Sequence, residues 1–271
     1  MIRTHTNNEI RQKAVKEIMP LTGVIDANFT LHELEEYLDK YSHEISVIHI
    51  NLEHKDRFAE NRTRKITALA HRRNVPTVTT VNGVLLRGAL PMYMEMCAAA
   101  GATRIQFNKD NINHDIKPRD VVQLADECNL DVHFEIENLI DERRVAKEES
   151  RFPFSTKGFV RTNEEVVREA EEWIQSGTMH VVVESSLSLS GKRRIQSGFA
   201  EILASAFGLH TVMFKAPTQY EQEGLLSLFG GEAHLCEVPL KDVKNVEMLR
   251  GNVAHHGTVL KDLYQETVSL R

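Results

Sequence analysis

The clearest fold signal lies in one segment near the carboxyl end, Thr211–Thr258, which reads TVMFKAPTQYEQEGLLSLFGGEAHLCEVPLKDVKNVEMLRGNVAHHGT. Its first apolar run ends on Lys215 at an Ala-Pro pair, and a helical segment and Gly230-Gly231 separate it from a second apolar run, Ala233–Val238. Strand, polar tip, helix and strand is the pattern of a βαβ unit in a parallel sheet. Such folds keep their chemistry at the ends of strands, so Lys215 is a candidate site residue, with a solvated loop lysine as the alternative.

The same pattern repeats along the rest of the chain. The other predicted strands are Gly23–Asp26, Ser46–Leu52, Val75–Val81, Thr103–Asn108, Leu130–Ile136 and His180–Glu184. About eight strand–helix units, roughly 25–35 residues apart, predict a single (β/α)8 TIM-type barrel, a fold that typically takes about 250 residues. The alternative is an open doubly wound sheet, which usually has a Gly-rich first turn; the first turn here, Asp26-Ala27-Asn28, has none.

Two amphipathic helices are expected to begin at capping boxes, Thr30–Glu33 and Thr162–Glu165. Residues 1–20 are predicted to form an N-terminal helical extension, helical over Glu9–Ile18, and residues 21–271 to form the barrel domain. A division into two domains is the alternative, but no linker supports it.

Composition limits the classes of function. The chain has 271 residues, 41% hydrophobic and 27% charged, with a formal charge of −6, which argues against nucleic acid or an anionic membrane as a partner. No apolar run approaches the ~20 residues of a membrane helix, and the polar amino-terminal segment has no apolar signal core. The 3 cysteines have no CxxC spacing and are typical of reduced thiols, so we expect a cytoplasmic protein.

Polar residues at the carboxyl ends of the predicted strands should meet at one mouth of the barrel. They are Asp26, His49, Asn51, Glu53, Asn82, Asn108, Glu135, Glu137, Glu184, Lys215 and Glu237. Charges so close to apolar runs are costly to bury unless they are paired or bound to a metal. Glu135 and Glu184 lie on neighbouring predicted strands and are the metal candidates, with Mg²⁺ the expected cofactor because it takes carboxylates together with waters. The alternative is a structural ion pair with Lys215.

A small anionic substrate is expected from a second set of residues. Lys192 and Arg193 belong to a basic run, Ser190–Arg194, that directly precedes a predicted helix, where backbone N–H groups and cations can hold phosphate. His255 precedes a short terminal helix after the last strand, where barrels often bind phosphate. Asn82, at the third strand tip, is assigned with them to substrate binding. The alternatives are a solvated basic run and an ordinary histidine pair.

Several motifs are absent from the sequence. There is no GxGxxG after a strand, no GxxxxGK[ST], no HExxH and no GxSxG. Nothing in the sequence therefore suggests a nicotinamide cofactor, ATP as a P-loop ligand, a structural zinc or a serine hydrolase. A catalytic cysteine remains an open alternative.

Several segments together resemble the phosphosulfolactate synthase family, thinly over residues 22–260 and most specifically in the carboxyl-terminal third. They are VID (24–26), LHELE (31–35), TNEE (162–165), VVVE (181–184), VMFKAPTQ (212–219), FG (229–230), KDV (241–243) and VEMLR (246–250). Members of that family are barrels that add sulfite to phosphoenolpyruvate with Mg²⁺, on the way to coenzyme M. Plant relatives are known as heat-stress-associated proteins. The resemblance implies the same fold and cofactor, and Asp26, Glu135 and Glu184 match positions where the family has acidic residues.

Four departures from the family pattern leave the exact substrate open. His49 stands where the family is expected to have a lysine, and Asn82-Gly83-Val84 stands in place of Gly-Gly-Thr. Gln106 and Lys215 each stand in place of an acid. An acid replaced by lysine inverts the local charge, and a lysine replaced by histidine changes the pKa of any proton-transfer group by several units.

The first hypothesis is therefore a Mg²⁺-dependent carbon–sulfur lyase that adds sulfite, or a similar nucleophile, to phosphoenolpyruvate. His49 or Lys215 would deliver a proton to the carbanion, and Asp26 is counted with these catalytic residues. Lys192, Arg193 and Lys215 would neutralise phosphate and sulfite.

The second hypothesis is a non-catalytic barrel paralogue that acts through protein contacts. The third is an aldolase-like Schiff base on Lys215, which needs a lysine of depressed pKa. Because parallel barrels often assemble, a homo-oligomer is also expected.

Overall fold

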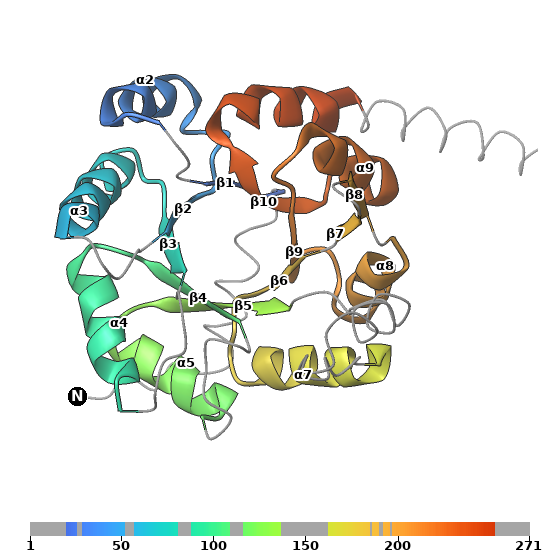
Figure 1. Cartoon of the computed structure of the whole chain (residues 1–271), viewed down its shortest axis with the longest axis horizontal. Coiled ribbons are helices and arrows are strands. Elements are labelled where there is room, and N and C mark those ends of the chain that lie inside the picture. Colours follow the sequence, from blue (N-terminus) through green and yellow to red (C-terminus); the bar gives the residue numbers. More distant parts are fainter. Residues whose placement is uncertain are drawn as a thin grey trace, which may run out of the picture.

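Eight parallel strands close into a barrel in the computed structural model, which describes residues 20–25, 29–51, 57–80, 88–108, 116–136, 162–184, 186–189, 192–195 and 197–252 (Figure 1). The strands are β1 (Thr22–Ile25), β2 (Val47–Asn51), β3 (Thr77–Thr80), β4 (Arg104–Asn108), β5 (Asp131–Ile136), β6 (His180–Val183), β9 (Val212–Lys215) and β10 (His234–Pro239). They follow the order β1-β10-β9-β6-β5-β4-β3-β2, and β2 pairs with β1 to complete the circle. The predicted (β/α)8 barrel is confirmed, and the open sheet is excluded.

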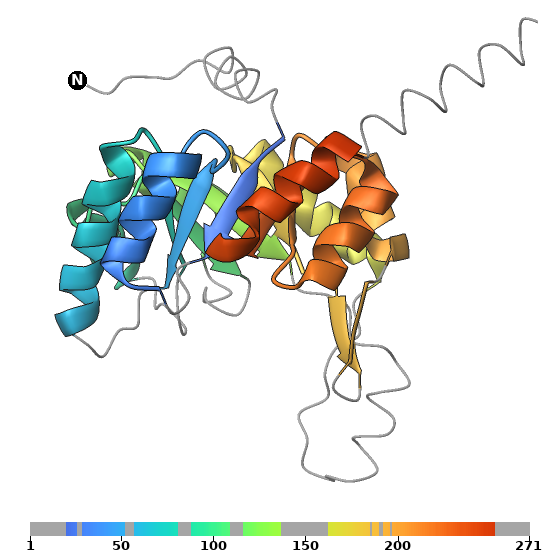
Figure 2. The same cartoon turned by 90° about the horizontal axis from the view of Figure 1, so that it is seen from above.

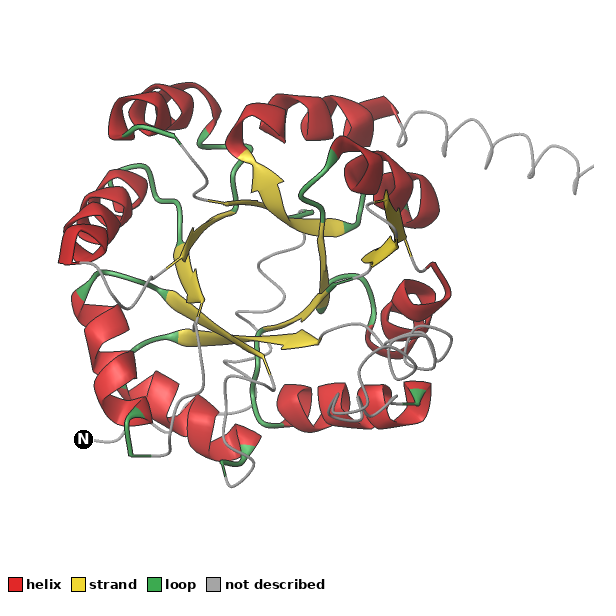
Figure 3. Ribbon diagram, in the orientation of Figure 1, coloured by secondary structure: helices red, strands yellow, loops and turns green. Residues whose placement is uncertain are grey.

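Helices surround the strands (Figure 3). They are α2 (Leu31–Tyr41), α3 (Arg57–His71), α4 (Leu90–Ala99), α5 (Pro118–Glu127), α7 (Asn163–Gln175), α8 (Ser197–Phe207), α9 (Gln219–Phe229) and, after the short 3-10 helix η2 (Leu240–Asp242), residues 243–252. Thr30 and Thr162 form the two predicted capping boxes, and Thr218 forms a third at the start of α9. The predicted N-terminal extension lies outside the described residues.

Strand alternation separates a helix-facing core from the barrel interior. On β5, Val132, Phe134 and Ile136 belong to the largest hydrophobic cluster, and the Phe134 ring stacks on Trp173 of α7 with centroids 4.1 Å apart. Because successive residues of a strand point to opposite faces, the residues between them lie inside the barrel. Glu135 lies between Phe134 and Ile136 on β5, and on β9 Lys215 follows Phe214 of the same helix-facing cluster, so both charged side chains face the interior.

Among the described residues, a small apolar layer lies in the interior, together with several polar side chains. The layer is a separate cluster made of Leu21, Val47, Val78, Val182, Met213 and Cys236. Inward-facing positions before and after this layer along the strands carry histidine, arginine, glutamine, glutamate and lysine, and buried side chains of these types require partners. The chemistry of the barrel interior is therefore concentrated in a few side chains.

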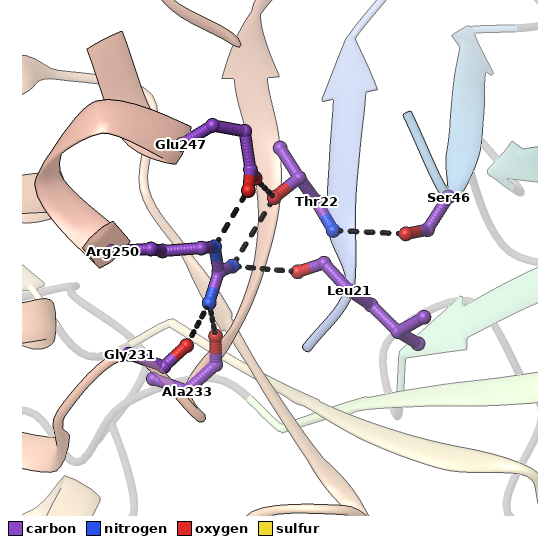
Figure 4. A network of polar contacts seen from close by, with 7 residues as sticks. All are labelled: Leu21, Thr22, Ser46, Gly231, Ala233, Glu247 and Arg250. Carbon is purple, nitrogen blue, oxygen red and sulfur yellow. Dashed lines mark hydrogen bonds and ion pairs between the residues drawn. The ribbon is translucent and has the colours of Figure 1, made fainter. Parts of the chain in front are cut away.

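Arg250 fastens the seam where β10 meets β1 (Figure 4). Its guanidinium donates hydrogen bonds to the carbonyl oxygens of Leu21, Gly231 and Ala233 and to the Oγ1 of Thr22. An ion pair of 3.2 Å joins it to Glu247 one turn earlier on the same helix. Arg250 thus ties the terminal helix to the first and last barrel strands.

A two-stranded hairpin, β7 (Ser186–Leu189) and β8 (Lys192–Ile195), follows β6 and extends away from the barrel in Figure 2. Ile195, at the end of the hairpin, packs against α9 at Gly224, where an added Cβ would lie 2.3 Å from Ile195 Cδ1. Since β7 begins just after β6 ends, the hairpin emerges at the carboxyl-end mouth. Within the described residues, no helix combines the length and the apolar character needed to cross a membrane.

The Arg250 contacts predict a large effect on stability. Arg250→Met removes the donors for three backbone carbonyls and breaks the ion pair with Glu247, which keeps the hydrogen bond from Thr22 Oγ1, so the free energy of unfolding should fall by about 3–5 kcal/mol. Urea unfolding of wild type and variant measures this loss. The matched control is Arg119→Met, an exposed position on α5, which should change stability by less than about 0.5 kcal/mol. Equal effects of both changes would contradict the proposed role of Arg250.

Candidate active site

Lys215 is the centre of a buried charged cluster at the carboxyl-end mouth of the barrel. It is the last residue of β9, and its Nζ contacts Glu135 Oε1 of β5 directly and Glu237 Oε1 of β10 at 3.0 Å. The three side chains are only 12%, 7% and 19% exposed. Their mutual pairing offsets the cost of burying charge. The loop-lysine alternative for Lys215 is therefore excluded.

Glu135 is held from a second direction. Gln106 of β4 donates a hydrogen bond of 2.8 Å from its Nε2 to Glu135 Oε2. One carboxylate oxygen thus faces a cation and the other a neutral amide. The structural ion pair that the sequence left open for Glu135 is present, and Gln106, an apparent departure from the family, has a defined role in it.

The charges of the cluster keep Lys215 protonated. Burial alone would lower the pKa of Lys215, but the negative charges of Glu237 and Glu135 outweigh burial and raise that pKa. Burial raises the pKa of Glu237, and the nearby Lys215 charge opposes this shift. An amine must lose its proton before it can attack a carbonyl, so this arrangement disfavours the Schiff-base hypothesis.

Glu237 reaches Lys215 because β10 contains a bulge. Thr22 of β1 pairs with Leu235, but Val24 pairs with Val238, so two residues of β10 stand opposite Gly23 alone. Leu235 and Val238 both belong to the helix-facing cluster, and the extra residue lets Glu237 turn inward. Its φ of +56° is in the left-handed region, which is uncommon for a residue other than glycine.

His49 lies beside this cluster as an uncharged imidazole. It is 2% exposed, and burial, with the positive charges of Lys215 and Arg104, lowers its pKa to about 3. Neither ring nitrogen has a hydrogen-bond partner among the described residues. Gly23 makes room for the ring, since an added Cβ there would lie 3.2 Å from His49 Nε2.

The other predicted site residues are only partly located. Glu184 directly follows β6, is half-buried, and lies close enough for its charge to act on Glu237 and Cys236. Lys192 and Arg193 belong to β8, whereas the sequence placed them in a loop at a helix start; α8 begins only at Ser197. Asp26, Asn82 and His255 lie outside the described residues.

Magnesium at Glu135 and Glu184 can be tested against this geometry. Both oxygens of Glu135 are engaged, one by the Lys215 ammonium and one by Gln106. Among the described residues, no group of three or more His, Cys, Asp or Glu side chains is arranged to hold a metal ion. A divalent ion at Glu135 would lie beside the buried Lys215 ammonium as a like charge, so the arrangement does not fit magnesium as it stands.

A second polar group lies deeper in the barrel, near the amino ends of the strands. His180 Nδ1 is 3.4 Å from His133 Nε2, and the rings of His180 and His234 have centroids 5.9 Å apart. Burial, with Arg104 among the neighbouring positive groups, lowers the pKa of His133 and His180 well below the usual value. Burial and the charge of Arg250 lower the pKa of His234 to about 4. No sequence pattern predicted this group of histidines.

A (β/α)8 barrel whose charged residues gather at the carboxyl ends of its strands is the arrangement found in barrel enzymes. The chain belongs to the family described as (2R)-phospho-3-sulfolactate synthase (ComA), whose model matches residues 12–255. The resemblance expected from the sequence is thereby confirmed, and family and fold support an enzyme. A search among curated proteins found no significant match.

Solved structures of low sequence identity share the fold. Thiamine phosphate pyrophosphorylase of Pyrococcus furiosus is 12% identical, with 88% of this chain and 98% of that chain covered and a TM-score of 0.54. Orotidine 5'-phosphate decarboxylase of Pyrococcus horikoshii is 10% identical, with 85% and 98% covered and a TM-score of 0.55. 3-Keto-L-gulonate-6-phosphate decarboxylase of Vibrio cholerae is 14% identical, with 87% of this chain and 99% of that chain covered and a TM-score of 0.56.

The neutral histidines of the interior predict acid lability. Of the described residues, His49, His133, His180 and His234 are buried with lowered pKa values, so they stay neutral in the folded state while the unfolded chain protonates near pH 6.5. Below that pH the unfolded state binds more protons, and stability should fall by about 5 kcal/mol per pH unit for the four together. Stability should be constant, as far as these groups act, above about pH 7.

Urea midpoints at pH 7.5 and 5.5 measure this slope. His180→Gln should reduce the slope by about a quarter, because one of four titrating groups is removed. The control His32→Gln changes an exposed histidine on α2 and should leave the slope as it is. Equal midpoints at the two pH values in the wild type would show that the interior histidines are not neutral.

Proposed function

We propose that this protein adds an anionic nucleophile, with sulfite the leading candidate, to phosphoenolpyruvate. The observation that carries the proposal is the Lys215 ammonium, which two carboxylates hold at the barrel mouth. Membership of the phosphosulfolactate synthase family supplies the substrate class. An ammonium held at the mouth suits a reaction in which negative charge develops on a small anion.

The proposed reaction forms one carbon–sulfur bond and adds one proton to the neighbouring carbon. Sulfur would bond to the methylene carbon of phosphoenolpyruvate, and the electron pair of the double bond would move to the carbon that bears phosphate and carboxylate. The resulting carbanion, delocalised into the carboxylate, takes a proton at that carbon. Such a carbanion is basic enough to accept a proton from an ammonium, so Lys215 is the proposed donor, and water would then reprotonate the amine.

His49 has a different part in this proposal. Its imidazole is uncharged, because burial lowers its pKa to about 3, so it can offer one N–H and one acceptor nitrogen but no positive charge. We assign it to positioning the substrate, and we keep proton delivery by His49 as the alternative that the sequence raised. Binding of phosphate by Lys192, Arg193, Asn82 and His255, and a catalytic part for Asp26, remain predictions.

Magnesium also remains a prediction for the same reaction. Bound at Glu135 and Glu184, it would supply a Lewis acid for the substrate carboxylate. Because Glu135 is engaged by Lys215 and Gln106, no step of the proposed reaction is assigned to the metal.

A non-catalytic role through protein contacts is the second candidate. The exposed apolar side chains available for such contacts lie on three helices: Met92 of α4, Tyr220 of α9 and Met248 of residues 243–252 are 68%, 57% and 59% exposed. Exposed side chains of this kind can also serve the expected homo-oligomer.

Phosphorus NMR of the purified protein with phosphoenolpyruvate and sulfite tests the reaction, with Mg²⁺ and with chelator in parallel. A new phosphate-ester signal that requires sulfite and protein is expected. Lys215→Met should slow its appearance by about 100-fold or more, since the charge that stabilises the transition state is lost. The control Lys244→Met removes an exposed lysine and should leave the rate unchanged.

Two results would count against this function. Absence of any new signal with folded wild-type protein would favour the non-catalytic role or another substrate. A rate that Lys215→Met leaves intact would separate the reaction from the Lys215 cluster.

A further inference from the structure

We propose that the Lys215 ammonium occupies the place of a divalent cation between Glu135 and Glu237, so that this chain carries the cation of its site within its own sequence. Cation binding by these two carboxylates is independent of the proposed function. Only the corollary, that turnover needs no divalent ion at Glu135 and Glu237, rests on that function.

The Nζ atom of Lys215 lies between carboxylates of two different strands, as a bound metal ion would. Lys215 extends from β9 to Glu135 on β5, past the intervening strand β6, and it also reaches Glu237 on the adjacent strand β10. A metal ion in a barrel would likewise bridge carboxylates that arrive from different strands. The ammonium has three N–H donors, and these two carboxylates can take two of them, which leaves a third for an oxygen of a substrate.

The contacts of the Glu135 carboxylate also support the proposal. Gln106 donates from a neutral amide to the carboxylate oxygen that Lys215 does not contact. Each oxygen of Glu135 thus has a donor, and the ammonium already balances the charge of the carboxylate. A divalent ion at Glu135 would have to displace the ammonium, which would then remain buried beside it as a like charge.

The third support is the local backbone around Glu237. Regular alternation would put this residue on the helix-facing side, but the bulge opposite Gly23 turns it inward at φ +56°. A residue other than glycine in this conformation is held there by its surroundings, and such strain is typical of functional sites. In this conformation Glu237 supplies Lys215 with a second carboxylate partner, at 3.0 Å.

Binding of Mn²⁺ to protein freed of metal with EDTA tests the inference, with electron paramagnetic resonance to measure the free ion. No substrate is present. The wild type should bind Mn²⁺ weakly, and Lys215→Gln, which removes the competing charge but retains a polar side chain, should tighten binding by about tenfold or more. The control Lys244→Gln alters an exposed lysine and should bind as the wild type does.

Tight binding by the wild type that Lys215→Gln leaves unchanged or weakens would overturn the inference, and so would weak binding by both proteins. Glu135→Gln covers the case in which Lys215→Gln fails to fold. If Glu135 is occupied by Lys215, Glu135→Gln should leave the weak wild-type binding unchanged; if Glu135 is a metal ligand, binding should be tight and the variant should lose it. These results are independent of the phosphorus NMR assay, whose silence would bear on the reaction alone.

Discussion

The pairing of β1 with β10 is the contact on which both the barrel and its site depend. It closes the sheet, and its irregularity, two residues of β10 against Gly23, is what turns Glu237 toward Lys215. The same glycine leaves room for the His49 ring. Arg250 fixes the amino end of this seam through the carbonyl oxygens of Leu21 and Ala233, the residues directly before the two strands. Closure of the fold and assembly of the charged cluster therefore rest on the same few residues.

Most of the fold could be predicted from the sequence because its strands are buried on both faces. Runs such as Val181–Val183 are apolar throughout, and the capping boxes at Thr30 and Thr162 mark helix starts with local hydrogen bonds. The meeting of Glu135 and Lys215 also follows from the sequence, since the carboxyl ends of parallel strands share one mouth.

Other parts of the site had no sequence signal strong enough to predict them. The inward turn of Glu237 depends on a bulge, and strict alternation predicts the opposite face. The hairpin β7–β8 was missed because a Ser-rich run followed by a basic run resembles a loop before a helix. The histidine group had a partial signal: His133 lies two residues before Glu135 on the same predicted strand, so both side chains face one side. Its pairing with His180 is visible only in the register of β5 with β6.

The central claim is that Lys215 is a buried ammonium bound by Glu135 and Glu237. The most direct measurement is a ¹H–¹⁵N NMR correlation of lysine side-chain nitrogens, with the Lys215 signal assigned by its loss in Lys215→Gln. A buried, hydrogen-bonded ammonium should give a signal protected from exchange at neutral pH, and Glu237→Gln should weaken that protection. A Lys215 nitrogen with the chemical shift of a neutral amine, or one that exchanges with water as fast as the exposed Lys244, would contradict the claim.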